Sequence, residues 1–97
     1  MTVSYHLQEW AFEWDEQKAR SNVEQHGVTF EEAAEAFLDP FSLVADASVS
    51  SEQRESILGY SFAQRLLLVV HVERSAVTRI VSARPATRAE RKLYEQP

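Results

Sequence analysis

Hydrophobic and polar positions alternate regularly at residues 9–14, where acidic residues interleave with large apolar ones. A period of two predicts a short, half-buried strand. Asp15 follows in the position of a helix N-cap, and the mostly polar residues after it predict a helix that continues to His26. Gly27 then stands where a left-handed C-terminal cap belongs, so we expect this helix to end there.

A second helix is predicted over residues 30–38. Thr29 and Glu32 have the spacing of a capping box, in which each side chain binds the other residue's backbone N–H. An apolar stripe at helical spacing indicates the face that packs on the core. The stripe consists of Phe30, Ala33, Ala34 and Phe37, and the opposite face carries the acidic residues Glu31, Glu32 and Glu35. Asp39 and Pro40 end the helix, because the residue before proline disfavours the helical conformation.

The second half of the chain favours strands. Residues 41–45 predict a short strand and residues 46–53 a polar surface loop. Three apolar, β-branched runs, at residues 54–61, 66–74 and 77–84, then predict consecutive antiparallel hairpins. Pro85 closes the last strand, and Thr87 with Glu90 forms a second capping box for a basic final helix.

The predicted order is therefore β-α-α-β-β-β-β-α, an α+β fold with an antiparallel sheet, two N-terminal helices and a C-terminal helix. Residues 1–97 are expected to form a single domain. If the first hairpin turns at residues 62–65, Arg54 lies opposite Glu73, on the same face as His71. A second turn at Ser75 and Ala76 adds further residues to that face. These are Thr78, Ile80, Ser82 and Arg84, with Arg74 and Arg79 on the other face. A register error of one residue would exchange the faces.

Composition narrows the functional classes. The longest apolar run, residues 66–70, is far shorter than the roughly 20 residues that cross a bilayer. The N-terminus lacks a signal-peptide layout, so we expect a soluble, cytoplasmic protein that contacts no membrane. Formal net charge is −5 overall, but residues 1–52 carry 11 acidic and 2 basic residues, whereas residues 53–97 carry 4 and 8. This division suggests a basic face able to meet an acidic ligand, although charge counts alone favour an ordinary solvated surface with uneven charge.

No metal site or cofactor is predicted. The chain has no cysteine and three histidines, none of which pair at the i, i+4 spacing of a helical zinc motif. A glycine-rich phosphate loop and a serine nucleophile elbow are also missing.

Arginine dominates the C-terminal half, with seven arginines against one lysine. The planar guanidinium binds phosphate oxygens in a bidentate way, which favours a phosphate-binding role. The arginines are Arg54, Arg65, Arg74, Arg79, Arg84, Arg88 and Arg91. Surface ion pairs with Glu55, Glu73 or Glu90 are the alternative.

His26 is the best candidate for proton transfer, because an imidazole titrates near neutral pH. Its alternative role is to cap the C-terminus of the first helix. His71 lies in an apolar strand and is expected to pack in the core, and His6 to lie in a loose N-terminus. Tyr94, in the basic final helix, is the aromatic residue best placed to stack on a base or bind a phosphate. The strand aromatics Trp10, Phe12 and Trp14 are assigned to packing.

The chain resembles the BrnT toxin family over residues 12–94. The first half of the resemblance is carried by Phe12-Glu13-Trp14-Asp15, Lys18, Asn22, His26-Gly27-Val28 and Phe30-Glu31-Glu32-Ala33. The second half is carried by Arg54, Ile57, Gly59, Leu67-Leu68-Val69-Val70-His71, Glu73-Arg74, Arg79-Ile80-Val81-Ser82-Ala83-Arg84, Ala86, Glu90-Arg91 and Tyr94. Gln25 departs from the family's tendency to place a lysine before the histidine. The resemblance implies a RelE-like fold, metal-independent RNA cleavage, and neutralisation by a BrnA-like antitoxin through which the complex binds operator DNA.

These observations lead to the hypothesis of a metal-independent endoribonuclease toxin of a type II toxin–antitoxin system, in which the 2′-hydroxyl of RNA attacks the adjacent phosphate. Phosphate stabilisation is assigned to Arg74 and Arg84, and proton transfer to His26. Positioning of RNA is assigned to Lys18, Arg54, Arg79, Arg88, Arg91 and Tyr94. The alternative is a non-catalytic module that binds an antitoxin and takes part in transcriptional autoregulation.

Overall fold

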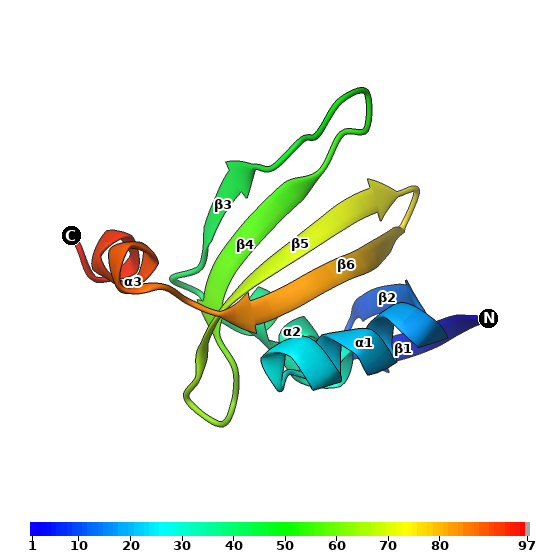
Figure 1. Cartoon of the computed structure of the whole chain (residues 1–97), viewed down its shortest axis with the longest axis horizontal. Coiled ribbons are helices and arrows are strands. Elements are labelled where there is room, and N and C mark those ends of the chain that lie inside the picture. Colours follow the sequence, from blue (N-terminus) through cyan, green and yellow to red (C-terminus); the bar gives the residue numbers. More distant parts are fainter. Residues whose placement is uncertain (97) are drawn as a thin grey trace.

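The computed structural model describes residues 1–96 and has three α-helices and a six-stranded mixed sheet (Figure 1). The strands are β1 (Thr2–Leu7), β2 (Trp10–Asp15), β3 (Leu43–Asp46), β4 (Glu55–Tyr60), β5 (Leu66–Arg74) and β6 (Val77–Pro85). The helices are α1 (Glu16–His26), α2 (Phe30–Glu35) with its 3₁₀ continuation η1 (Ala36–Leu38), and α3 (Arg88–Glu95). The α+β class predicted from the sequence is confirmed.

The order of elements corrects the prediction, because a strand precedes the predicted first one. β1 pairs antiparallel with β2, and Gln8 turns the hairpin with a φ of 54°. His6 thus lies in a strand, opposite Ala11, and not in a loose N-terminus. Alternating apolar residues signal this strand in the sequence. They are Val3, Tyr5 and Leu7, which pack against the core.

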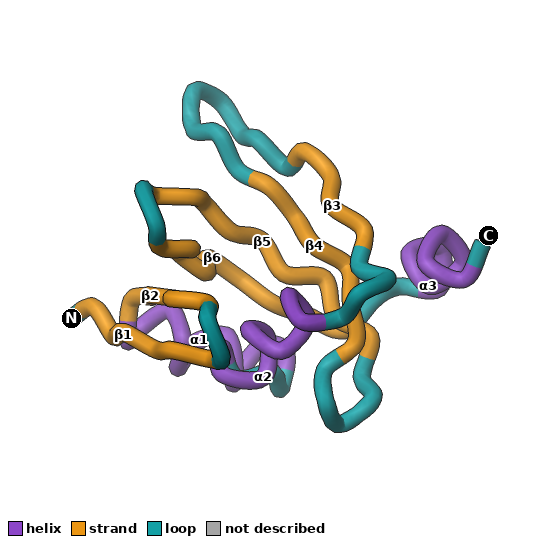
Figure 2. The backbone as a smooth tube through the Cα atoms, turned by 180° about the vertical axis from the view of Figure 1, so that it is seen from behind, coloured by secondary structure: helices purple, strands orange, loops and turns teal. Residues whose placement is uncertain are grey.

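The prediction of a wholly antiparallel sheet is also wrong, because the sheet is mixed. Its strands lie in the order β1-β2-β6-β5-β4-β3, which can be followed in Figure 2. β2 and β6 are parallel, and their pairing consists of Phe12 with Thr78 and Glu13 with Arg79. Beyond Arg79 the edge of β6 therefore has no strand partner, and α1 runs beside it. This edge, which α1 covers in place of a strand, positions the candidate site described below.

Local signals specify the helix ends as predicted, with one exception. Asp15 caps α1 by accepting from the Lys18 N–H, and Gly27 ends it with a φ of 68°. The capping box of α3 is complete. At α2 Thr29 accepts from the Glu32 N–H, but the Glu32 carboxylate binds Arg65 instead of returning to Thr29. The capping box predicted from Thr29 and Glu32 is therefore only half formed, because the guanidinium is the stronger partner.

The hydrophobic core lies between α2–η1 and one face of the sheet. Phe30, Ala33, Ala34 and Phe37 contribute the predicted helical stripe, all of it buried. The sheet contributes Phe12, Trp14, Ile57, Leu67, Val69, Ile80 and Ala83. Figure 1 shows α1 and α2 together beside β2, whereas α3 lies at the opposite end of the sheet. Within residues 1–96, no helix has the length and apolarity needed to cross a membrane.

Strand register corrects which arginines share a face. The loop between β4 and β5 spans residues 61–65, one residue longer than predicted, so Glu55 and not Arg54 lies on the face of His71. Val70 pairs with Ser82, but His71 pairs with Ile80, so Val81 forms a bulge. An extra residue reverses the alternation of side chains.

The bulge moves Ser82 and Arg84 to the face opposite the core. Arg74 and Arg79 already lie on that face, as strand alternation requires. Arg54 joins them through the longer loop. We call this surface, on the side of the sheet away from the core cluster, the outer face. The sheet therefore has a basic surface, as predicted, but the prediction placed Arg54 and Arg84 on the wrong face.

Candidate nucleic-acid interface

An open pocket of about 530 Å³ lies where α1 runs along the outer face. The helix contributes Lys18 and His26, and the segment before β4 contributes Arg54. Three residues predicted to bind or cleave RNA are thus brought together. The remaining lining residues are Asp15, Gln17, Ser21, Asn22, Gln25, Val81 and Ser82. We call this the α1–β6 pocket.

Asn22 fixes α1 against the unpaired edge of β6. Its side-chain amide donates to the Ala83 carbonyl at 2.8 Å, and its carbonyl accepts from the Ala83 N–H at 3.0 Å. The amide also donates to the Val28 carbonyl at 2.9 Å. The side chain therefore provides the hydrogen bonds that a neighbouring strand would have supplied to β6. It holds the floor of the pocket in place without presenting a charge.

Arg54 extends into the pocket with only 27% of its side chain exposed. Its guanidinium lies beside Glu52, with Nε 3.2 Å from Oε1. That Nε atom is buried and has no hydrogen-bond partner within residues 1–96. Arg54 also donates from a terminal amino group to the Glu52 carboxylate at 3.3 Å, so an incoming phosphate would have to displace Glu52 from the guanidinium.

Several basic side chains lie near the exposed carboxylate of Glu52 and lower its pKa. A hydrogen bond from Arg54 lowers the pKa of Glu52, and the charge of Arg54 acts in the same direction. The positive charges of Lys18 and Arg74 lower this pKa further. Three basic residues from three elements therefore act electrostatically on one exposed carboxylate. RNA phosphates would enter the same positive potential.

His26 and Lys18 lie toward opposite ends of the pocket. Both side chains are exposed. Eight residues of helix separate them, about 12 Å along the helix axis. An exposed imidazole at one end and cationic groups at the other provide a proton-transfer group and a phosphate-binding group along the same groove.

Arg74 and Arg84 do not converge on the pocket. Arg74 pairs with Val77 at the hairpin end of β6, and Arg84 lies seven residues further along that strand. At about 3.3 Å per residue the two positions are roughly 20 Å apart, too far to contact one phosphate. They lie on the same face, on either side of the α1–β6 pocket, so the two residues assigned to phosphate stabilisation are not brought to one place.

Arg79 and Arg84 each bind a carboxylate of the same chain. Arg79 donates to Glu13 at 2.9 Å across the parallel β2–β6 pair. Arg84 makes a two-pronged contact with Glu90, both bonds 2.8 Å. The hydrogen bonds from Arg84 lower the pKa of Glu90 to about 2, with the Thr87 N–H contributing. RNA would have to compete with these carboxylates for the guanidinium groups.

Comparison with known proteins identifies the family. The family model described as "Ribonuclease toxin, BrnT, of type II toxin-antitoxin system" matches residues 14–90. The chain belongs to the BrnT family. A crystal structure of the Brucella abortus ribonuclease toxin BrnT is similar in fold, with a TM-score of 0.60 and 22% identity over 77% of this chain and 94% of that one. A search of curated proteins found no match.

The BrnT match begins at the end of β2 and continues from α1 through β6, and therefore includes the whole α1–β6 pocket. It ends within α3, before Arg91 and Tyr94. In the structure Tyr94 docks that helix: its hydroxyl donates to Asp39, and its ring packs edge-on against Tyr60. Burial and the bond to Asp39 raise the pKa of Tyr94 to about 12. Arg91 donates to the Tyr60 hydroxyl, and Arg88 is exposed.

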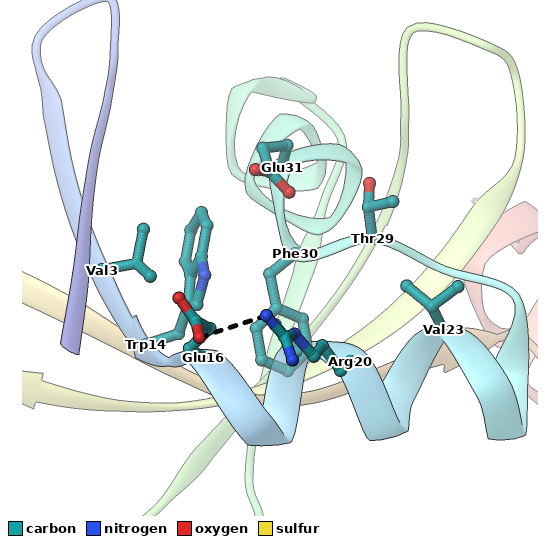
Figure 3. A pocket seen from close by; sticks show the side chains of 9 residues that line it. Val3, Trp14, Glu16, Arg20, Val23, Thr29, Phe30 and Glu31 are labelled. Atoms are coloured by element: carbon teal, nitrogen blue, oxygen red, sulfur yellow. Dashed lines mark ion pairs between the residues drawn. The ribbon is translucent and has the colours of Figure 1, made fainter. Parts of the chain in front are cut away.

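A second groove lies on the other side of α1 (Figure 3). Trp14, Val23 and Phe30 are among its walls, and its volume is about 240 Å³. Its charged pair, Arg20 with Glu16 at 3.3 Å, is a one-turn surface contact. Pairs of this kind contribute at most about 1 kcal/mol. Arg20 therefore has the charge and the helix of Lys18 but lies away from the α1–β6 pocket.

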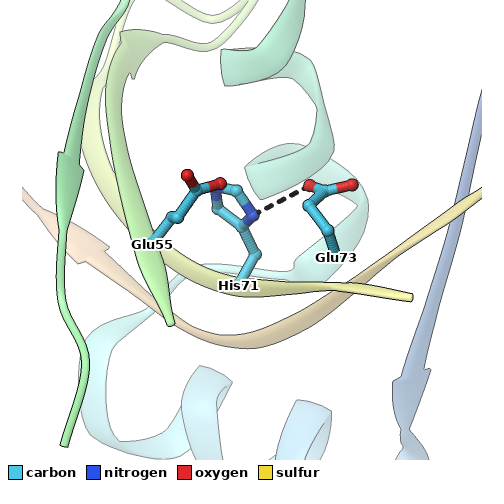
Figure 4. Close-up of side chains that lie close together, drawn as sticks. All are labelled: Glu55, His71 and Glu73. Atoms are coloured by element: carbon cyan, nitrogen blue, oxygen red, sulfur yellow. Dashed lines mark ion pairs between the residues drawn. The ribbon is translucent and has the colours of Figure 1, made fainter. Parts of the chain in front are cut away.

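No role was predicted from the sequence for Asn22, which was marked only as part of the family resemblance, and a cluster on the core side of the sheet was not predicted. Glu55, His71 and Glu73 meet there (Figure 4). His71 is buried as predicted and packs edge-on against Phe37. Burial lowers its pKa, against the opposing effect of the Glu73 and Glu55 charges. In the sequence, the i, i+2 spacing of His71 and Glu73 on one strand indicates that they share a face. Glu55 joins them only through the pairing of β4 with β5.

Proposed function

We propose that this BrnT-family chain is a metal-independent endoribonuclease toxin. The α1–β6 pocket is the observation that carries the proposal, because it gathers an imidazole and two cationic side chains on an open face. Membership of a family of ribonuclease toxins supports the same reaction class. The groups present are those needed to bind a phosphodiester and to move a proton.

In the proposed reaction the 2′-hydroxyl of RNA attacks the adjacent phosphorus and the bond to the 5′-oxygen of the next nucleotide breaks. His26 accepts the proton of the attacking 2′-hydroxyl, a water molecule supplies a proton to the departing 5′-oxygen, and the products are a 2′,3′-cyclic phosphate and a 5′-hydroxyl. Arg54 and Lys18 stabilise negative charge that develops on the phosphate oxygens. Guanidinium and ammonium groups supply this stabilisation by hydrogen bonds and charge, so a divalent cation is not required.

Arg74 and Arg84 bind phosphates on either side of the scissile linkage. Their spacing of roughly 20 Å along the strand direction suits a single strand of a few nucleotides better than one phosphate. Arg79, Arg88, Arg91 and Tyr94 extend this track. Binding at Arg79 and Arg84 involves exchange of a carboxylate partner for a phosphate.

The proposed partner is a BrnA-like protein antitoxin, through which the pair contacts operator DNA. A type II toxin–antitoxin family implies a protein antitoxin and an RNA substrate. The proposed site of action is the cytoplasm. Co-expression with the neighbouring reading frame, followed by gel filtration, tests this partner: a stable complex supports it, and separate elution of the two proteins contradicts it.

Activity is tested with purified, partner-free protein, a single-stranded RNA and excess EDTA. We expect cleavage that stops when the nucleotide 5′ of the cut carries a 2′-deoxy or 2′-O-methyl group, because the nucleophile is then missing. His26→Ala should reduce the rate by about 100-fold while leaving the circular dichroism spectrum unchanged. Unchanged turnover in His26→Ala would assign the imidazole to helix capping alone.

A second candidate function is a non-catalytic antitoxin-binding module. The ion pairs that engage Arg54, Arg79 and Arg84 favour it, because they leave fewer free cationic groups for RNA. The same EDTA assay separates the two functions. Protein that is folded and binds the antitoxin but leaves RNA intact, with and without added divalent cations, supports the binding module.

A further inference from the structure

Three potential metal ligands meet on the core side of the sheet. Glu55 on β4 is the register partner of His71 on β5. Glu73 follows two residues later on the same strand and therefore points to the same face. One ligand atom from each of the three residues can be chosen so that all lie within 4.8 Å of one another, and Figure 4 shows the three side chains directed together.

The histidine at the centre lacks the contacts that a buried imidazole normally makes. His71 is only 3% exposed. Nδ1 lies 3.2 Å from the Glu73 carboxylate, yet neither ring nitrogen has a hydrogen-bond partner within the described part of the chain. Buried polar groups are rarely left in this state without a ligand or a water. The imidazole therefore points to a missing partner.

The charges around it are also unbalanced. Among residues 1–96, neither Glu55 nor Glu73 forms an ion pair with a lysine or arginine. Thr78 donates its hydroxyl to both carboxylate oxygens of Glu73, at 3.0 and 3.1 Å. Outer contacts of this kind orient a carboxylate for metal binding. Two carboxylates facing one imidazole are neutralised by a single divalent cation.

We propose that Glu55, His71 and Glu73 form a binding site for a divalent transition-metal ion, with Zn²⁺ as the best fit. Zn²⁺ binds imidazole nitrogen and carboxylate oxygen at about 2.0–2.2 Å, which requires ligand atoms roughly 3.3 Å apart in a tetrahedron. The separation of Nδ1 from Glu73 already meets this requirement. Small side-chain rotations bring the third ligand in.

The adjoining space suits a fourth ligand. A cavity of about 190 Å³ opens over the cluster and is lined by the three ligands and Gln53. A water can complete the coordination there. Mg²⁺ is a poorer fit, because it prefers an all-oxygen octahedral shell and retains its own waters.

The site is separate from the α1–β6 pocket. Arg54 and Glu55 are consecutive, and consecutive side chains of an extended chain point to opposite faces. The cation would join the ends of β4 and β5 without contacting RNA on the outer face. Zn²⁺ is thus a stabilising ligand of the fold, which is compatible with RNA cleavage that needs no metal.

Titration of tag-free, EDTA-treated protein with ZnCl₂ in a calorimeter tests the site. We expect one ion per chain and an increase in Tm of about 10 °C at a 100-fold excess over Kd. Glu55→Gln and Glu73→Gln should each weaken binding at least about tenfold. Both side chains are exposed, so these variants should fold as the parent does.

Variants of the other two histidines provide the matched control. His6→Gln and His26→Gln remove exposed imidazoles and should leave Zn²⁺ binding unchanged. Substitution with Co²⁺ should give the visible absorption of a four- or five-coordinate ion. Failure to bind Zn²⁺, or binding that survives in Glu55→Gln and Glu73→Gln but is lost in the control variants, would overturn the proposal whatever the outcome of the RNA assays.

Discussion

Asn22 illustrates how much one uncharged residue contributes to this site. It is 5% exposed in an otherwise polar helix, and its three hydrogen bonds join α1 to β6 and to the turn after Gly27. Because β2 pairs with β6 over so short a length, this side chain replaces part of a missing strand. The same residue determines how far Lys18 and His26 lie from Ser82.

Asn22→Ala should lower the free energy of unfolding by about 2–4 kcal/mol, because the Ala83 backbone loses both partners in a buried setting. Urea denaturation followed by circular dichroism measures this loss. Ser21→Ala, one residue away and exposed, is the control and should stay within about 0.5 kcal/mol of the parent. Equal losses in the two variants would show that Asn22 does not anchor the helix.

Glu90 makes a prediction about acid stability. Its folded-state pKa of about 2 lies below its ordinary value of 4.5, so the folded state favours the ionised form. The stabilisation is fully present above about pH 4.5 and is lost as the pH falls toward 2. Thermal unfolding across this range should show a steeper decline for the parent than for Glu90→Gln. Parallel curves would contradict the Arg84–Glu90 contact.

At the scale of elements, the acidic face of α2 is engaged inside the molecule. Glu32 accepts from Arg65 and from the Ser61 hydroxyl, and these bonds, led by the Arg65 contact, lower the pKa of Glu32. Glu35 accepts from the Phe62 N–H. The β4–β5 loop is thereby fastened to α2. The acidic N-terminal half consequently offers less free surface to a basic partner than its composition suggests.

Gly59 allows β4 to pack closely under η1. A Cβ atom at this position would lie 2.6 Å from the Ala36 carbonyl oxygen and 3.3 Å from the Ser42 Cβ. Backbone must move to relieve the first contact, so Gly59→Ala should destabilise the protein by about 1–3 kcal/mol. Differential scanning calorimetry measures the change.

Gly27→Ala is the comparison for Gly59→Ala, because a Cβ at Gly27 meets nothing within 4 Å. Its φ of 68° should alone cost about 1 kcal/mol. A Gly59→Ala variant as stable as the parent would contradict the close approach of η1 to β4.

The positions of helices and strands could be predicted from the sequence better than the register and pairing of the strands. Caps at Asp15, Gly27 and Thr87 are local signals, so the ends of α1 and the start of α3 were predictable. The register of β4 against β5 depends on one residue of loop length, and the Val81 bulge on packing across three strands. Neither the register nor the bulge is marked by a local sequence signal. The faces of Arg54 and Arg84 were therefore assigned incorrectly.

For the candidate site, too, residue types could be predicted from the sequence, but their positions in space could not. Lys18, His26 and Arg54 were chosen by residue type and family resemblance, and the fold brings them to one pocket. Arg74 and Arg84 were chosen in the same way but lie on either side of it, because distance along a strand cannot be closed by side chains alone. The roles of Asn22 and of the Glu55–His71–Glu73 cluster depend on tertiary contacts, so the sequence pattern did not predict them.

At the scale of the whole molecule, the sheet separates two chemistries. The outer face carries Arg54, Arg74, Arg79 and Arg84, and the core side carries α2–η1 and the acidic cluster around His71. A molecule with a formal net charge of −5 can thus present a basic surface to RNA, because potential near a surface depends on local charge. The overall acidity does not exclude a polyanionic substrate.

The central claim is that the α1–β6 pocket holds the RNA linkage that is cleaved. Its most direct test compares kcat/KM for cleavage of one RNA, in EDTA, by Arg54→Ala and Arg20→Ala. Both variants remove one arginine, but Arg20 lies in the groove on the other side of α1. We predict a loss of about 100-fold for Arg54→Ala and a change within about twofold for Arg20→Ala. Equal activity in the two folded variants would contradict the account.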